Sequence, residues 1–105
     1  MKVLLVCSGG MSSSMLVRSM ENEAKKREIP LSIESTGSDG IEDKISSFDV
    51  LLVAPQVRHR FERLSGAAAK AGIPAAVIDR QDYGLMRGDA VLDQVEELLN
   101  NHTEG

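Results

Sequence analysis

The chain has 105 residues, of which 42% are hydrophobic and only 3% aromatic, and its formal net charge is −4. This length suits one domain with an aliphatic core that needs neither disulfides nor a metal. The acidic balance argues against nucleic-acid binding and against adsorption to an anionic membrane, since both need a dense basic surface. One cysteine excludes an internal disulfide, and only two distant histidines, His59 and His102, accompany it. We therefore expect a cytoplasmic protein with no metal and no cofactor.

The first half of the chain predicts a strand, a loop and a helix. Residues 2–6 (KVLLV) are mostly apolar, which is typical of a strand buried on both faces, but the run is too short to span a membrane. A helix is predicted from residue 11 to the proline at position 30. The apolar positions that recur at helical spacing, and that we expect to face the core, are Met15, Leu16, Met20 and Ala24.

The rest of the chain continues this alternation. Strands are predicted over 31–35, 49–54 and 75–78, and a short helical segment over 41–48. A further helix follows Pro55 and is closed by Gly72. Residues 79–89 are predicted as a loop and the segment from Val91 to Leu99 as a last amphipathic helix. Together 1–100 form a single domain, and 101–105 are expected to be a flexible tail. The apolar stripe of the helix after Pro55 consists of Val57, Phe61, Leu64, Ala68 and Ala71.

This order of elements predicts an α/β fold with a doubly wound, four-stranded parallel sheet, strand order 2-1-3-4, and helices on both faces. The order reverses between the first and third strands, and ligand sites form at the carboxyl ends of strands at such a switch point. The loops after Val6 and Ala54 therefore flank the expected site.

The only cysteine of the chain, Cys7, lies where the first strand ends, in the stretch CSGGMSSS. Two glycines let the backbone approach a bound group closely, and backbone N–H groups, hydroxyls and a helix amino terminus can hold an oxyanion. The same donors would stabilise a thiolate, which favours phosphoryl transfer through phosphocysteine. The alternative is a small buried side chain followed by a plain turn. The expected phosphate-binding loop is Ser8, Gly9, Gly10, Met11, Ser12, Ser13 and Ser14.

The cysteine loop is similar to that of the low-molecular-weight tyrosine phosphatases, whose fold we also expect here. Those enzymes place an arginine six positions after the cysteine, and Ser13 occupies that position in this chain. The guanidinium that would clamp a phosphate and stabilise its transition state is missing from the loop. Such a loop is suited to carry a phosphoryl group, although a cysteine phosphatase and a non-catalytic regulatory domain of the same fold remain alternatives.

Three stretches give a more specific resemblance: LLVCSGGMSSSMLV, LLVAPQV and VIDRQDYGLMRGDAVL. In this order and spacing they resemble the IIB component of the lactose/cellobiose family of the bacterial phosphoenolpyruvate-dependent sugar phosphotransferase system (PTS). The resemblance covers the chain up to about Leu99. It implies a phosphotransferase in which Cys7 receives a phosphoryl group from a phosphohistidine of the IIA component. Cys7 would pass that group to a cellobiose-, lactose- or chitobiose-like sugar held by the membrane component IIC. We also expect a monomer, which reaches the membrane only through IIC.

Other polar residues are candidates for the rim of the site or for partner contacts. Gln56 is expected to face the cysteine loop, with a local backbone hydrogen bond as the alternative. Asp79 is expected to cap or turn the chain, and Tyr83 to pack over the loop. The basic residues off the apolar stripe are expected to form a solvated face, in which Arg58 or Arg60 could steer an acidic partner; they are Arg58, His59, Arg60 and Arg63.

Overall fold

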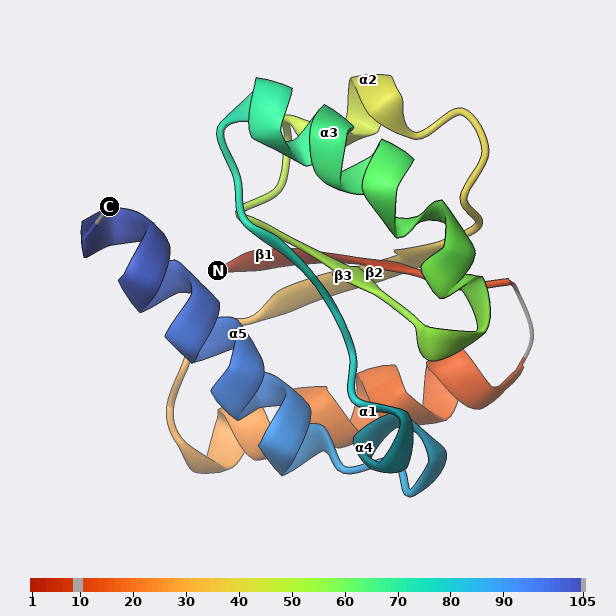
Figure 1. The fold of residues 1–105 in the computed structure, drawn as a ribbon. Coiled ribbons are helices and arrows are strands. Elements are labelled where there is room, and N and C mark those ends of the chain that lie inside the picture. The colour runs from red at the N-terminus through yellow and green to blue at the C-terminus, as the bar shows by residue number, and fades with distance from the viewer. Residues whose placement is uncertain (9–10, 105) are drawn as a thin grey trace.

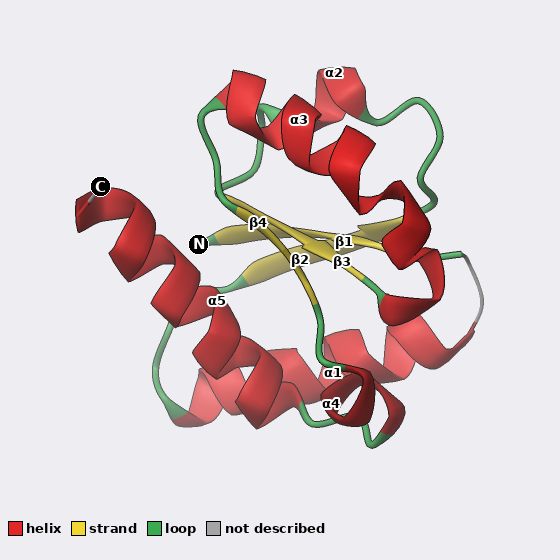
Figure 2. Ribbon diagram, in the orientation of Figure 1, coloured by secondary structure: helices red, strands yellow, loops and turns green. Residues whose placement is uncertain are grey.

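Four strands form one parallel sheet in the order β2-β1-β3-β4, which confirms the predicted topology (Figure 2). The computed structural model describes residues 1–8 and 11–104, without the side chains of 11–13 and 102–104. The central strand β1 pairs with both neighbours, so that Val6 lies opposite Thr36 of β2 and Val53 of β3. The strands are β1 (Lys2–Val6), β2 (Ser32–Thr36), β3 (Val50–Val53) and β4 (Ala75–Val77).

Helices cover both faces of the sheet (Figure 1). Helices α2 and α3 lie on one face, and α1, α4 and α5 lie on the other, as a doubly wound sheet requires. A 3₁₀ helix, η1, joins β3 to α3. The bounds are α1 (Met11–Lys26), α2 (Glu42–Ile45), η1 (Pro55–Arg60), α3 (Phe61–Ala71), α4 (Arg80–Gly84) and α5 (Gly88–Glu104).

The core is aliphatic and is centred on β1 and β3, whose side chains from Val3 to Val6 and from Val50 to Val53 are all buried. These strands are buried on both faces because helices pack on each side, which explains why their apolar runs are continuous. Leu16, Met20 and Ala24 of α1 are buried as predicted. Among the described residues, no helix is both long and apolar enough to cross a bilayer.

Met15 does not face the core, so that prediction is wrong: its side chain is 62% exposed. The buried stripe of α1 runs through Leu16, Met20 and Ala24, which are four residues apart and stack on one face. Met15 lies about 100° away from Leu16 around the helix axis and falls outside that stripe.

Residues 79–89 are not one loop, because α4 forms within them. The Asp79 carboxylate accepts hydrogen bonds from the backbone N–H groups of Gln81 and Asp82, at 2.9 and 3.2 Å, and so starts the helix. This also confirms that Asp79 is a cap. Helix α5 begins at Gly88 and continues to Glu104, so the segment expected as a flexible tail is helical over 101–104.

Arg27, just after α1, ties α1 to α5. Its guanidinium forms ion pairs with Glu23 at 2.9 Å, Asp93 at 2.8 Å and Glu96 at 2.9 Å. The hydrogen bond to Glu23, followed by that to Asp93, raises the pKa of Arg27 above its usual range. The two helices are thereby joined by charge as well as by their apolar contacts.

Candidate functional site

Cys7 follows β1 directly and lies at the point where the strand order reverses. Its backbone N–H donates to the carbonyl of Thr36 at 2.9 Å, so the residue is held against the carboxyl end of β2. The thiol lies 3.7 Å from the same carbonyl oxygen and donates to it. The side chain is only 4% exposed, yet it lines a surface hollow. The one thiol of the chain is therefore positioned by the central strand β1, which it follows, and by the edge strand β2, to which it is hydrogen-bonded.

The hollow at Cys7 has a volume of about 370 Å³ and is built from three segments that follow strands β1, β2 and β3. It is large enough for a phosphoryl group with surrounding water. Parallel strands bring these segments to one edge of the sheet, as the sequence predicted. The lining residues are Cys7, Ser8, Gly37, Ser38, Asp39, Gln56, Val57, His59 and Arg60.

Part of the expected phosphate-binding loop is helical in the structure. Helix α1 begins at Met11, so Met11 to Ser14 form its first turn rather than a loop. Gly9 and Gly10 lie outside the described residues, as do the side chains of 11–13. The first backbone N–H groups of an α-helix have no acceptor within the helix, and the helix dipole favours an anion there. The helix start thus follows Cys7 closely in sequence.

Gln56 lines the same hollow as Cys7, in agreement with its expected position. The turn that carries it is not the regular helix predicted after Pro55. It is the 3₁₀ helix η1, with a break at Val57, where φ is −117° and ψ is 23°. In a 3₁₀ helix side chains three positions apart lie on the same side, and Val57 and Arg60 both line the hollow.

The basic residues of η1 and α3 are not a uniform solvated face. Arg60 donates to the carboxylate of Asp39 at 3.2 Å, and Arg63 donates to the carbonyl of Ser38 at 2.6 Å. Both contacts hold the segment after β2 against the start of α3. These contacts do not follow from the sequence, because η1 departs from the regular helical period of 100° per residue on which the prediction of a solvated face rests. Arg58 is exposed and does not line the Cys7 hollow.

Tyr83 is buried and lies further along the same edge of the sheet. It lines a separate hollow of about 330 Å³ that also includes Gln56. Tyr83 therefore lies over the turn after β3, and Gln56 stands between the two hollows. Asp79 lines neither hollow.

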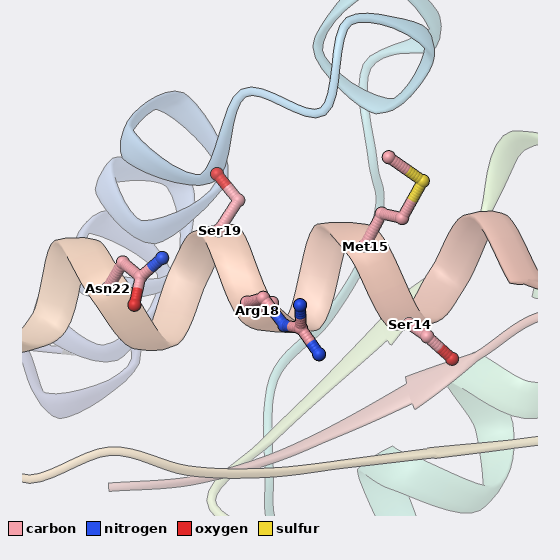
Figure 3. A pocket seen from close by; sticks show the side chains of 5 residues that line it. All are labelled: Ser14, Met15, Arg18, Ser19 and Asn22. Carbon is pink, nitrogen blue, oxygen red and sulfur yellow. The ribbon is translucent and has the colours of Figure 1, made fainter.

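A third hollow, of about 450 Å³, follows the outer face of α1 (Figure 3). The side chains of Met15 and Ser19 project toward α4 and the segment that leads into α5. The residues that line this hollow include no cysteine, histidine or carboxylate, so it offers neither a thiol nor a general base that could activate its serine hydroxyls. Its lining residues are Ser14, Met15, Arg18, Ser19 and Asn22.

The Cys7 hollow is thus the candidate site. It combines a thiol, an amide, an imidazole and an arginine–carboxylate pair. Among the described residues, no group of three or more histidine, cysteine or acidic side chains could hold a metal ion. The groups present suit the binding and covalent transfer of an anion.

Several known proteins are similar to this chain in sequence. The model of the family "PTS system, Lactose/Cellobiose specific IIB subunit" matches residues 2–94. A galactose-specific EIIB component of the PTS from Lactococcus lactis is 37% identical, over 93% of this chain and 95% of that protein. A lactose-specific EIICB component from Staphylococcus epidermidis is 30% identical, over 94% of this chain but 17% of that protein.

A solved structure gives the same result for the fold. The solution structure of a cellobiose-specific phosphotransferase IIB component from Borrelia burgdorferi superposes with a TM-score of 0.80 at 40% identity. The match covers 97% of this chain and 94% of that one. Sequence and fold agree over almost the whole chain, and the chain belongs to the lactose/cellobiose-specific IIB subunits of the PTS.

Proposed function

We propose that this chain is a phosphocarrier in which Cys7 accepts a phosphoryl group from the IIA component and passes it to a sugar held by the membrane component IIC. The observation that carries the proposal is the position of Cys7, the only thiol, in a hollow at the switch point of the sheet. The sugar would be of the cellobiose, lactose or chitobiose class, in keeping with the family. The chain would act in the cytoplasm and reach the membrane through IIC.

Each transfer conserves atoms and charge. In the first, the sulfur of Cys7 attacks the phosphorus, the N–P bond of the donor phosphohistidine breaks and an S–P bond forms. The thiol proton is released, and the donor nitrogen takes up a proton. In the second, the S–P bond breaks as an O–P bond forms to the sugar. The sugar hydroxyl loses its proton and the Cys7 sulfur regains one.

The contact between the thiol and the Thr36 carbonyl bears on the first step. A thiolate has no proton to donate, so this contact is lost when Cys7 becomes nucleophilic. Helix α1 begins at Met11, shortly after Cys7 in the sequence. Its amino terminus can stabilise the thiolate, since helix amino termini favour anions.

The names of relatives support one of the proposed partners, IIC. Relatives named EIICB join a domain like this one to a IIC part in a single protein, which supports an association with IIC. A carrier must release each partner quickly, so both contacts should be small and transient. We propose that this chain itself is a monomer.

The test uses the purified chain with phosphoenolpyruvate, the general proteins of the phosphotransferase system and a IIA partner. Intact mass spectrometry should detect one added phosphoryl group on the wild-type chain and none on Cys7→Ser. A chain that remains unmodified while IIA is phosphorylated would contradict the proposal. Val6→Ala, in the core beside Cys7, controls for loss of transfer through altered packing alone, because it keeps the thiol.

A further inference from the structure

The Cys7 hollow contains one permanent positive charge, the guanidinium of Arg60, and one carboxylate, that of Asp39. The arginine comes from η1, which follows β3, and not from the loop after the cysteine. A guanidinium presents a planar set of donors that matches the oxygens of a phosphoryl group. The cysteine loop has Ser13 where tyrosine phosphatases have an arginine, but η1 supplies a guanidinium to the same hollow through Arg60.

Arg60 is engaged with Asp39, but only weakly. The distance from Nη1 to Oδ1 is 3.2 Å, and the two side chains are 41% and 90% exposed. Exposed ion pairs of this kind contribute little to stability, because water and salt screen the charges. Asp39 stays hydrated when the pair breaks, so little opposes the exchange of Asp39 for another anion.

The backbone around the pair is held in place by other contacts. Arg63 donates to the carbonyl of Ser38 at 2.6 Å, and Cys7 donates from its backbone to Thr36 at 2.9 Å. The buried side chain of Val57 anchors η1 to the core. Arg60 could therefore change its partner by side-chain rotation alone, without a movement of the loop after β2 or of η1.

We propose that Arg60 is a phosphoryl-binding residue: when Cys7 is phosphorylated, its guanidinium leaves Asp39 and binds the phosphoryl oxygens across the hollow. A side-chain phosphoryl group carries about 1.5 to 2 negative charges near neutral pH, against one on a carboxylate. The guanidinium therefore gains charge-assisted hydrogen bonds by the exchange. Asp39 competes for Arg60 and holds it when the cysteine is free. This inference rests on the proposed function and adds a residue to it.

The direct probe is the phosphorus NMR signal of the phosphorylated chain, followed as a function of pH. A bound guanidinium favours the doubly ionised phosphoryl group and so lowers the midpoint of its titration. Arg60→Gln should raise that midpoint by about one pH unit, which corresponds to a tenfold change in proton affinity. Arg87→Gln removes an equal charge from the segment before α5, outside the hollow, and should leave the midpoint unchanged.

Asp39→Asn gives the opposite test, because it removes the competing carboxylate. The midpoint should fall, and the fall should be smaller when Arg60 is already Gln, since the two side chains act on each other. If Asp39→Asn raises the midpoint as Arg60→Gln does, Arg60 depends on Asp39 for its position and the exchange is wrong.

His59 also lines the hollow, so its imidazole is the other side chain that could bind the phosphoryl oxygens. A shift on His59→Gln with none on Arg60→Gln would assign the cation to His59 and overturn the proposal. The outcome for the proposed function is read separately. A wild-type chain that gives no phosphocysteine signal refutes the phosphocarrier, whereas equal midpoints in the phosphorylated wild type and Arg60→Gln refute only the role of Arg60.

Discussion

Ser19 of α1 and Gly88, the first residue of α5, are in direct contact: the Gly88 backbone N–H donates to the Ser19 hydroxyl at 3.0 Å. The hydroxyl in turn donates to the carbonyl of Met86 at 3.0 Å. Met86 itself has a φ of 54°, in the left-handed region. One small side chain thus fixes the turn between α4 and α5 on the surface of α1.

Replacing Gly88 by Ala should destabilise the fold, because the new Cβ would lie 2.4 Å from the backbone carbon of Ser19. The two helices would have to separate, at a cost of about 1–3 kcal/mol in the free energy of unfolding. Urea denaturation measures this change. The matched control is Gly66→Ala in α3, where no atom lies within 4 Å of the added methyl group. That variant should gain about 0.5–1 kcal/mol, because alanine is the better helix former. Equal effects at the two sites would contradict the close packing of α1 and α5.

Replacing Arg27 by Met should lower the free energy of unfolding, because Glu23, Asp93 and Glu96 would lose their shared cation. The loss should shrink as salt is added, since screening weakens these pairs. It should not vary with pH in the neutral range. The raised pKa of Arg27 stabilises the folded state at every pH below its ordinary value, which lies far above neutral.

Urea denaturation at low and high salt measures the effect of Arg27→Met. Lys44→Gln serves as the control, because it breaks a single exposed ion pair, that with Glu34. The control should change stability by only a few tenths of a kcal/mol. A loss on Arg27→Met that is independent of salt would show that apolar packing, and not charge, joins the two helices there.

The sheet could be predicted from sequence because β1 and β3 are continuous apolar runs, and their burial on both faces admits few topologies. Helix α4 was missed because it is one short turn without an apolar stripe. Its signal was the Asp79 cap with an acidic residue, Asp82, three positions later. Met15 was assigned to the core because hydrophobicity alone does not separate two adjacent positions at the edge of a helix face.

The chain should be a poor phosphatase, although the sequence around Cys7 resembles the cysteine loop of the low-molecular-weight tyrosine phosphatases. Ser13 stands where those enzymes have an arginine, and Arg60 is engaged with Asp39 when no phosphocysteine is present. Loss of one transition-state donor costs about 100-fold to 1,000-fold in rate. Turnover of an aryl phosphate should therefore lie at least about 100-fold below that of a tyrosine phosphatase measured in parallel. Comparable turnover that disappears in Cys7→Ser would favour the phosphatase over the carrier.

Arg58 should steer the partners rather than bind the phosphoryl group, because it is exposed beside the hollow but does not line it. Arg58→Glu should slow association with unphosphorylated IIA by roughly threefold to tenfold at low salt, and less at high salt. The free energy of unfolding should stay the same. Stopped-flow fluorescence of labelled IIA measures the rate, with Arg87→Glu as the charge-matched control. An equal slowing in both variants would mean that net charge, and not a local surface, governs the encounter.

The candidate site was predictable in part. Gln56 could be placed near the thiol from the sequence alone. Both residues follow predicted neighbouring strands, and the carboxyl ends of such strands meet at the point where the strand order reverses. The arginine–carboxylate pair was not predictable, because it joins the segment after β2 to a 3₁₀ turn whose geometry departs from a regular helix at Val57. That contact depends on tertiary structure, and no local pattern in residues 58–61 (RHRF) indicates it.

Cys7 should carry the phosphoryl group, and His59 is the alternative acceptor because it lines the same hollow. The most direct measurement is peptide mapping by mass spectrometry after transfer from phosphorylated IIA, on the wild type, Cys7→Ser and His59→Gln. We predict that the added mass is found on the peptide that contains Cys7, that Cys7→Ser accepts none, and that His59→Gln is still phosphorylated on Cys7. A phosphoryl group on the His59 peptide, retained in Cys7→Ser and lost in His59→Gln, would contradict phosphoryl transfer through Cys7.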